Sequence, residues 1–154
     1  LILLLACLML GCSSSDELSP EEQVIAVINE MEQAVEEKDM DRVGEAISKD
    51  YHDPHGHDRK AVMRLVQFYF LRNKAIHLFT KVQGIEIPEG QETPIANVVV
   101  FVAMAGSPIT DPGSLPGISG DFHRFEVIMR LEGDDWRLLT ADWRRARQDD
   151  FSID

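Results

Sequence analysis

Residues 134–145, DDWRLLTADWRR, decide how the C-terminal half of the chain folds. Gly133, just before this stretch, and Asp134, its first residue, form a Gly-Asp pair that favours a tight hairpin turn. A tryptophan and a run of mostly apolar residues follow at once, as expected where a strand leaves such a turn. We therefore predict that residues 135–147 form the last strand of an antiparallel sheet.

Three earlier segments show the same two-residue period. Residues 75–87 alternate between two faces, and residues 95–105 are almost continuously apolar and rich in valine, as in a central strand. Residues 121–132 place a histidine and four apolar side chains on one face. Between the last two lie residues 106–121, with four glycines and three prolines. A connection of that length and composition predicts a flap or lid.

Three helices are predicted before these strands, over residues 19–39, 40–51 and 58–73. In the first, Ser19 is a suitable N-cap and Glu22 completes a capping box. Each helix has one apolar stripe that predicts a face turned to the core. The predicted buried side of the third helix consists of Val62, Leu65, Val66 and Tyr69.

Three helices followed by four long antiparallel strands resemble the nuclear transport factor 2-like superfamily. The resemblance is carried by KDMDRVGEAISKDY at 38–51, GHDRKAV at 56–62 and the last strand, and it covers residues 20–147. It implies an α+β cone, in which a strongly curved four-stranded sheet wraps three N-terminal helices and leaves a pocket at one end. The superfamily contains ketosteroid isomerases, scytalone dehydratase, polyketide cyclases and binding-only domains, so the fold does not give the activity.

The N-terminus differs in kind from the rest of the chain. Residues 1–11 form an apolar run of signal-peptide length, too short to span a membrane, and residues 12–19 read as a polar tether. The run ends in MLGC, which resembles the lipobox of bacterial lipoproteins and predicts lipidation at Cys12, with Cys7 as the alternative. Because Ser13 follows that cysteine, the resemblance implies anchoring at the periplasmic face of the outer membrane. Residues 148–154 are predicted to be a C-terminal tail.

The charge balance excludes one class of partner. The chain has 154 residues, with 15 Lys and Arg against 27 Asp and Glu, and a net charge of −12. A nucleic-acid-binding protein would need a basic face, so nucleic acid is not an expected partner. The same negative charge argues against electrostatic adhesion to anionic lipid.

The stretch DYHDPHGHD, residues 50–58, gathers three histidines and three aspartates. Imidazole and carboxylate are ligands for Zn²⁺, Cu²⁺ or Ni²⁺, but the spacing H-x₂-H-x-H does not recur in zinc sites. Asp58 is the expected N-cap of the third helix, and Gly56 suits a turn. We favour a polar turn over a metal site and expect no cofactor; acid–base or ligand contacts at the mouth of a pocket, led by His55, remain open.

Two further side chains are candidates for chemistry. Asp142 interrupts the last strand, where alternation places it on the face of Leu138, and a carboxylate facing a dry cone could act as a general base. His123 lies on the apolar face of its strand and could assist it. The alternative is that Asp142 pairs with an arginine on the outer face, and that His123 is a core residue. Two tyrosines are candidate ligand-binding residues in the pocket: Tyr51 and Tyr69.

Three functions fit these features. The first is a lipid-anchored, non-catalytic domain that binds a small apolar ligand or a protein partner, with a homodimer left open. The second is an isomerase, dehydratase or cyclase that uses Asp142. The third and weakest is a metal-binding lipoprotein that uses residues 52–57.

Overall fold

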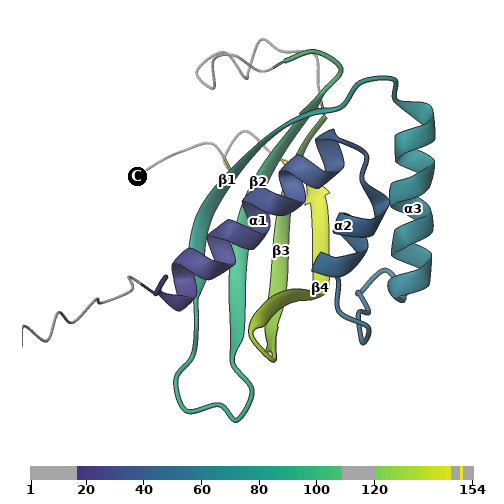
Figure 1. The fold of residues 1–154 in the computed structure, drawn as a ribbon. Coiled ribbons are helices and arrows are strands. Elements are labelled where there is room, and N and C mark those ends of the chain that lie inside the picture. Colours follow the sequence, from purple (N-terminus) through teal and green to yellow (C-terminus); the bar gives the residue numbers. More distant parts are fainter. Residues whose placement is uncertain (1–16, 109–120, 147–149, 151–154) are drawn as a thin grey trace, which may run out of the picture.

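Four antiparallel strands in sequential order form one curved sheet; the first helix lies across its inner face, and the other two helices lie beside its last strand (Figure 1). The computed structural model describes residues 17–108, 121–146 and 150. Cys7, Cys12 and most of the predicted lid therefore lie outside the described residues. The predicted α+β architecture is confirmed. The helices are α1 (Pro20–Glu36), α2 (Met40–Ala46) and α3 (Arg59–Arg72); the strands are β1 (His77–Glu86), β2 (Ile95–Ala105), β3 (Asp121–Glu132) and β4 (Asp135–Arg145).

The helix starts follow the caps predicted from the sequence. The Ser19 hydroxyl accepts a hydrogen bond from the Glu22 amide at 3.2 Å, and the Glu22 carboxylate accepts one from the Ser19 amide at 2.8 Å. This capping box satisfies two amides that the first turn of α1 would otherwise leave unpaired. At the start of α3, the Asp58 carboxylate accepts from the Ala61 amide at 2.7 Å.

The helix α2 ends earlier than predicted, at Ala46 rather than at residue 51. Ile47 has an extended backbone and forms an isolated parallel bridge with Leu138 of β4. A tertiary contact thus draws this segment away from helical geometry. Among the described residues, we find no helix that is both long and apolar enough to cross a membrane.

The core lies between α1 and the inner face of the sheet. Val24 of α1, Val98 of β2 and Met129 of β3 are almost completely buried. Trp136 of β4 is also buried, and its indole N–H donates to the Gln23 side chain of α1 at 3.2 Å. These contacts fix α1 across the sheet and leave the edge strand β4 beside α2 and its following loop (Figure 1).

A β-bulge in β4 changes which residues face the core. Leu138 pairs with Met129 and Thr140 pairs with Ile128, so Leu139 is an extra residue between two consecutive pairs. An extra residue reverses the alternation of side chains beyond it. The inner-face residues of β4 are Trp136 and Leu138 before the bulge and Ala141 and Trp143 after it.

The expectation that Asp142 shares the face of Leu138 is therefore wrong. Asp142 pairs with Glu126 of β3 and lies on the outer face of the sheet, where its side chain is 58% exposed. The reason is the bulge at Leu139, which strict two-residue alternation does not anticipate.

Candidate functional site

The histidine-rich loop is fastened to the bulged edge of the sheet. The Ser48 amide donates to the Leu138 carbonyl at 2.9 Å, and the His52 amide donates to the Leu139 carbonyl at 3.2 Å. His52 also bridges to Asp58, which closes the loop just before α3 begins. The loop therefore has a fixed position beside β4.

Asp53 organises this loop from a buried position. Its side chain is fully buried, and its Oδ1 atom accepts from the backbone amides of His55 and His57, both at 2.9 Å. Its Oδ2 atom accepts from the Tyr51 hydroxyl at 3.0 Å. Burial alone would raise the pKa of Asp53, but the hydrogen bonds from His57 and Tyr51 lower it below the usual value. Asp53 is therefore an ionised carboxylate that accepts several donors.

This carboxylate sets the state of the His57 ring. The His57 Nδ1 atom lies 3.0 Å from Asp53 Oδ2, and an ionised carboxylate can only accept, so Nδ1 carries the hydrogen in this assignment. In the neutral ring, Nε2 then holds a lone pair. The His57 side chain is 29% exposed. The loop thus presents an imidazole whose orientation is fixed by Asp53 and whose Nε2 atom can accept a hydrogen bond.

Tyr51 supports Asp53 and lines neither of the two hollows described below. Burial, followed by the hydrogen bond to Asp53 and its negative charge, raises the pKa of Tyr51 well above the usual value. The phenol therefore remains protonated and donates to the carboxylate. A ligand-binding role for Tyr51 stays a prediction.

A row of aromatic rings extends from this loop along the inner face of the sheet. The Trp143 ring centroid lies 4.2 Å from that of His55 and 6.0 Å from that of His57. The planes of the His57 and Trp143 rings are 19° from parallel. Phe125 continues the row at 6.3 Å from Trp143, and His123 follows at 6.2 Å from Phe125. We call these five residues the ring row. The row combines partly buried apolar rings, Phe125 and Trp143, with imidazole side chains at both ends.

His55 lies where the inner and outer faces of the sheet meet at the edge strand. Its ring contacts Trp143 on the inner face, and its Nε2 atom lies 3.0 Å from Asp142 Oδ1 on the outer face. Asp142 therefore has a histidine partner, although the strand face differs from the prediction. The partly exposed contact positions His55 over Trp143.

His123 lies at the far end of the ring row, on the predicted inner face. Within the described part of the chain, its buried Nδ1 atom has no hydrogen-bond partner. Burial lowers the pKa of His123; Asp121 opposes the shift, and Arg145 adds to it. The pKa of Tyr69 on α3 is raised by burial and by Asp121. The proposed catalytic pair is not formed, because Asp142 is on the opposite face.

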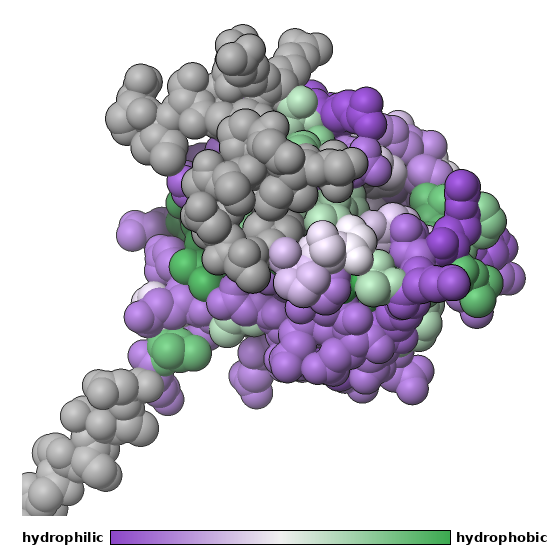
Figure 2. All heavy atoms as spheres, turned by 90° about the horizontal axis from the view of Figure 1, so that it is seen from above, coloured by the Kyte–Doolittle hydropathy of each residue, from purple (hydrophilic) through white to green (hydrophobic). Residues whose placement is uncertain are grey.

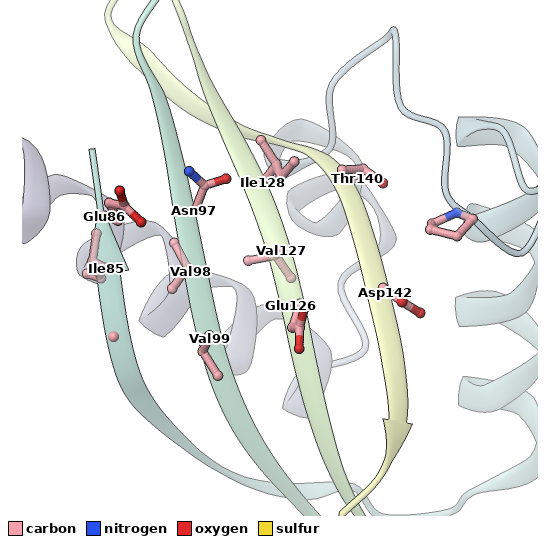
Figure 3. Close-up of a pocket in the computed structure, with 12 residues that line it drawn as sticks. Ile85, Glu86, Asn97, Val98, Val99, Glu126, Val127, Ile128, Thr140 and Asp142 are labelled. Carbon is pink, nitrogen blue, oxygen red and sulfur yellow. The ribbon is translucent and has the colours of Figure 1, made fainter. Parts of the chain in front are cut away.

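We describe two of the hollows formed by the described residues, and neither of these two lies between α1 and the sheet. The first, of about 490 Å³, lies on the outer face of the sheet beside Pro54 and Asp142, with Glu86 and Glu126 on its walls (Figure 3). The second, of about 710 Å³, lies between α2 and α3. The predicted apolar cavity beneath the bent sheet differs from both. No three His, Cys, Asp or Glu side chains of residues 17–108, 121–146 and 150 are grouped so as to hold a metal ion.

Sequence reasoning missed Trp143 as a site residue. The signal was the spacing of Trp136 and Trp143, which are seven residues apart in one strand. An odd spacing puts two residues on opposite faces of a regular strand, yet both are apolar and suited to the core. The pattern therefore indicated a phase change between them.

Comparisons with known proteins identify the fold. No family model matches the chain, and no curated protein matches it. A provisionally assigned scytalone dehydratase from Novosphingobium aromaticivorans superposes with a TM-score of 0.63 at 12% identity, covering 82% of this chain and 84% of that one. A provisionally assigned dehydratase of the NTF2-like family from Streptomyces avermitilis gives 0.58 at 15% identity, covering 84% and 99%. The fold is nuclear transport factor 2-like.

A similar fold also occurs within a longer chain. Bd1075 from Bdellovibrio bacteriovorus superposes with a TM-score of 0.58 at 11% identity, over 81% of this chain. The chain spans only 40% of the length of that protein. At these identities, the similarity shows the shared fold.

Proposed function

We propose that the protein is a lipoprotein of the outer membrane, facing the periplasm, whose nuclear transport factor 2-like domain binds a small, flat, mostly apolar molecule on the ring row. The observation that carries this proposal is the pair of nearly parallel His57 and Trp143 rings, with His57 held by the buried Asp53. The anchor is Cys12, proposed from its lipobox-like sequence.

The chemistry of the ligand follows from the groups that the ring row presents. Aromatic faces favour a flat apolar ring stacked with an offset. His57 Nε2 is an acceptor in the assigned tautomer, so it suits a ligand that carries a hydroxyl or N–H group. A weakly acidic aromatic alcohol combines both features. The net charge of −12 disfavours strongly anionic ligands.

Acid–base catalysis is the second candidate, and one arrangement favours it. A buried carboxylate that orients a partly exposed imidazole through Nδ1 is the pattern of a positioned general base. Two of the similar structures carry provisional dehydratase names, which agrees with such chemistry. In this version the base is His57, oriented by Asp53, and Asp142 instead holds His55.

Binding to the ring row is tested with 2-naphthol as the probe. We expect Trp143→Leu to weaken its binding about threefold to tenfold, since an aromatic pair contributes about 0.5–1.5 kcal/mol. Isothermal titration of the wild type and the variant measures this difference. Phe68→Leu is the matched control, because it removes an exposed aromatic ring from α3, away from the ring row. Equal losses in the two variants, or no binding by the wild type, would count against the proposed ligand class.

The anchor is tested separately. Cys12→Ala is expected to abolish incorporation of radiolabelled palmitate and to release the protein from the membrane fraction. Cys7→Ala is the control and should retain the label. The opposite pattern would move the anchor to Cys7, and labelling of neither wild type nor variants would contradict a lipoprotein.

A further inference from the structure

The helix α3 has a charge opposite to that of the whole protein. Its sequence RKAVMRLVQFYFLR contains Arg59, Lys60, Arg64 and Arg72 and no acidic residue. The complete chain has a net charge of −12. The sequence argued against adhesion to anionic lipid because the net charge of the whole chain is negative. That net charge does not reveal the local positive charge of α3.

The same helix exposes large apolar side chains. Leu65 is 45% exposed, Phe68 is 56% exposed and Leu71 is 80% exposed. Residues three apart are neighbours on one side of a helix, so these three form a continuous stripe. The prediction that Leu65 is buried is wrong, because α3 turns Val66 and Phe70 toward the core instead.

The cations lie beside this stripe. The Arg72 guanidinium lies 5.4 Å from the centre of the Phe68 ring, so it covers part of the apolar surface. Helical spacing places Lys60 and Arg64, both exposed, on the same side as Leu71. Arg59 differs, since it donates to the Gly44 and Ile47 carbonyls and holds α2 against α3. We call the exposed stripe and its three cations, Lys60, Arg64 and Arg72, the α3 face.

The hollow between α2 and α3 continues the positive surface. Its walls include Lys49, Lys60 and Arg64. Asp58 is the acidic residue that also lines it, and its carboxylate is engaged with the amide of Ala61. In Figure 1, α3 stands at one side of the molecule, and in Figure 2 hydrophobic surface appears among hydrophilic surface on that side.

We propose that the α3 face docks onto an anionic membrane surface. Leu65, Phe68 and Leu71 would enter the boundary between headgroups and acyl chains. The three cations would lie against lipid phosphates, with their aliphatic stems along the apolar layer. Mixed apolar and cationic side chains on one exposed face suit this boundary. The negative charge over the rest of the protein would orient it with α3 toward the lipid.

This inference does not depend on the ligand proposed above, and it does not require the lipid anchor. An anchor would keep the domain near the bilayer, so that even weak docking is populated. Docking would then set the orientation of the domain on the membrane.

The test places a fluorescent reporter on the α3 face of the full-length chain. Leu71→Trp is compared with Gln91→Trp, an exposed position in the connection between β1 and β2. Vesicles contain phosphatidylglycerol and dibrominated phosphatidylcholine, whose bromines quench indole on contact. We expect the added emission of Leu71→Trp to fall at least twofold more than that of Gln91→Trp. The comparison holds even if the apolar N-terminus binds the vesicle, because only a docked α3 brings residue 71 to the bromines.

A second experiment tests whether docking requires the positive charges of the α3 face. Arg64→Glu in the Leu71→Trp background should weaken the vesicle affinity, measured by titrating the quenching with lipid, at least fivefold, since one cation near an anionic surface is worth about fivefold in binding. Lys81→Glu, an exposed lysine on β1, is the matched control and should change it less than twofold. High salt and vesicles of phosphatidylcholine alone should also abolish the quenching.

Two results would overturn the proposal. One is equal quenching of Leu71→Trp and Gln91→Trp, or equal quenching on anionic and neutral vesicles. The other is a dimer in solution that Phe68→Ser converts to a monomer, together with no quenching of Leu71→Trp. In that case a second copy of the chain, and not lipid, covers the α3 face.

Discussion

Asp53→Asn should lower the free energy of unfolding by about 2–4 kcal/mol at pH 7, because it disrupts a buried charged acceptor with several donors. The substitution keeps the shape of the side chain. It replaces an ionised oxygen with an amide that cannot accept from both Tyr51 and the His57 ring. Urea unfolding followed by circular dichroism measures the difference.

The control for this prediction is Asp50→Asn in the same loop. Asp50 contacts Arg130 at 2.7 Å, but its side chain is 71% exposed, so the loss should stay below about 1 kcal/mol. Similar losses for the two variants would show that Asp53 is not the organising residue of the loop.

The effect of Asp53 should also depend on pH in a defined direction. The pKa of Asp53 in the folded protein lies below its usual value of 3.8, which approximates the unfolded chain. A lowered folded pKa gives stability that is present above the unfolded pKa and is lost as pH falls through the folded pKa. The difference between wild type and Asp53→Asn should therefore be full at pH 5–7 and shrink below about pH 4. A constant difference down to pH 3 would contradict this assignment.

Local chemistry made the outline of the fold predictable. The capping box of Ser19 and Glu22 and the N-cap at Asp58 mark helix starts through contacts within four residues. The strands β2 and β3 have the predicted bounds, because each strand has a regular apolar pattern and is flanked by turn residues. In each case the residues that determine the start or end of the element are close together in the sequence.

Distant contacts set the features that were not predicted. The His52 amide donates to the carbonyl of Leu139, the extra residue of the bulge, and these residues are far apart in the chain. The sequence pattern does not reveal that contact or the bulge, so two-residue alternation assigned Asp142 to the wrong face of the sheet. The end of α2 has the same cause, because Ile47 leaves the helix to bridge Leu138.

The candidate site was predicted in part for the same reason. The sequence singled out the histidine loop and left open whether it is a structural turn or a set of contacts at a pocket mouth. The structure shows that Asp53 holds the turn together and that His57 and His55 contact Trp143, while a role of His55 in ligand contacts stays a prediction. Trp143 joins them only because the bulge turns it inward, so its role depends on tertiary structure.

The last prediction concerns Trp136, on the other side of the bulge. Trp136 is 3% exposed and packs in the core, and its indole N–H donates to Gln23 of α1. Trp136→Ala should lower the free energy of unfolding by about 3–5 kcal/mol, because it removes a buried aromatic ring and leaves a cavity between β4 and α1. Thermal and urea unfolding followed by circular dichroism measure this loss.

Trp136→Phe distinguishes the contribution of the buried aromatic ring from that of its hydrogen bond to Gln23. This variant keeps most of the buried apolar surface and loses the bond to Gln23, worth about 0.5–1.5 kcal/mol, with a further small packing loss. It also leaves Trp143 as the only tryptophan of the chain, so its emission reports on the ring row alone. If Trp136→Ala costs no more than Trp136→Phe, α1 is not held to β4 by this ring. If Trp136→Phe keeps both its fold and its response to 2-naphthol, the two sides of the bulge have separate tasks: Trp136 supports the core, and Trp143 forms the binding surface.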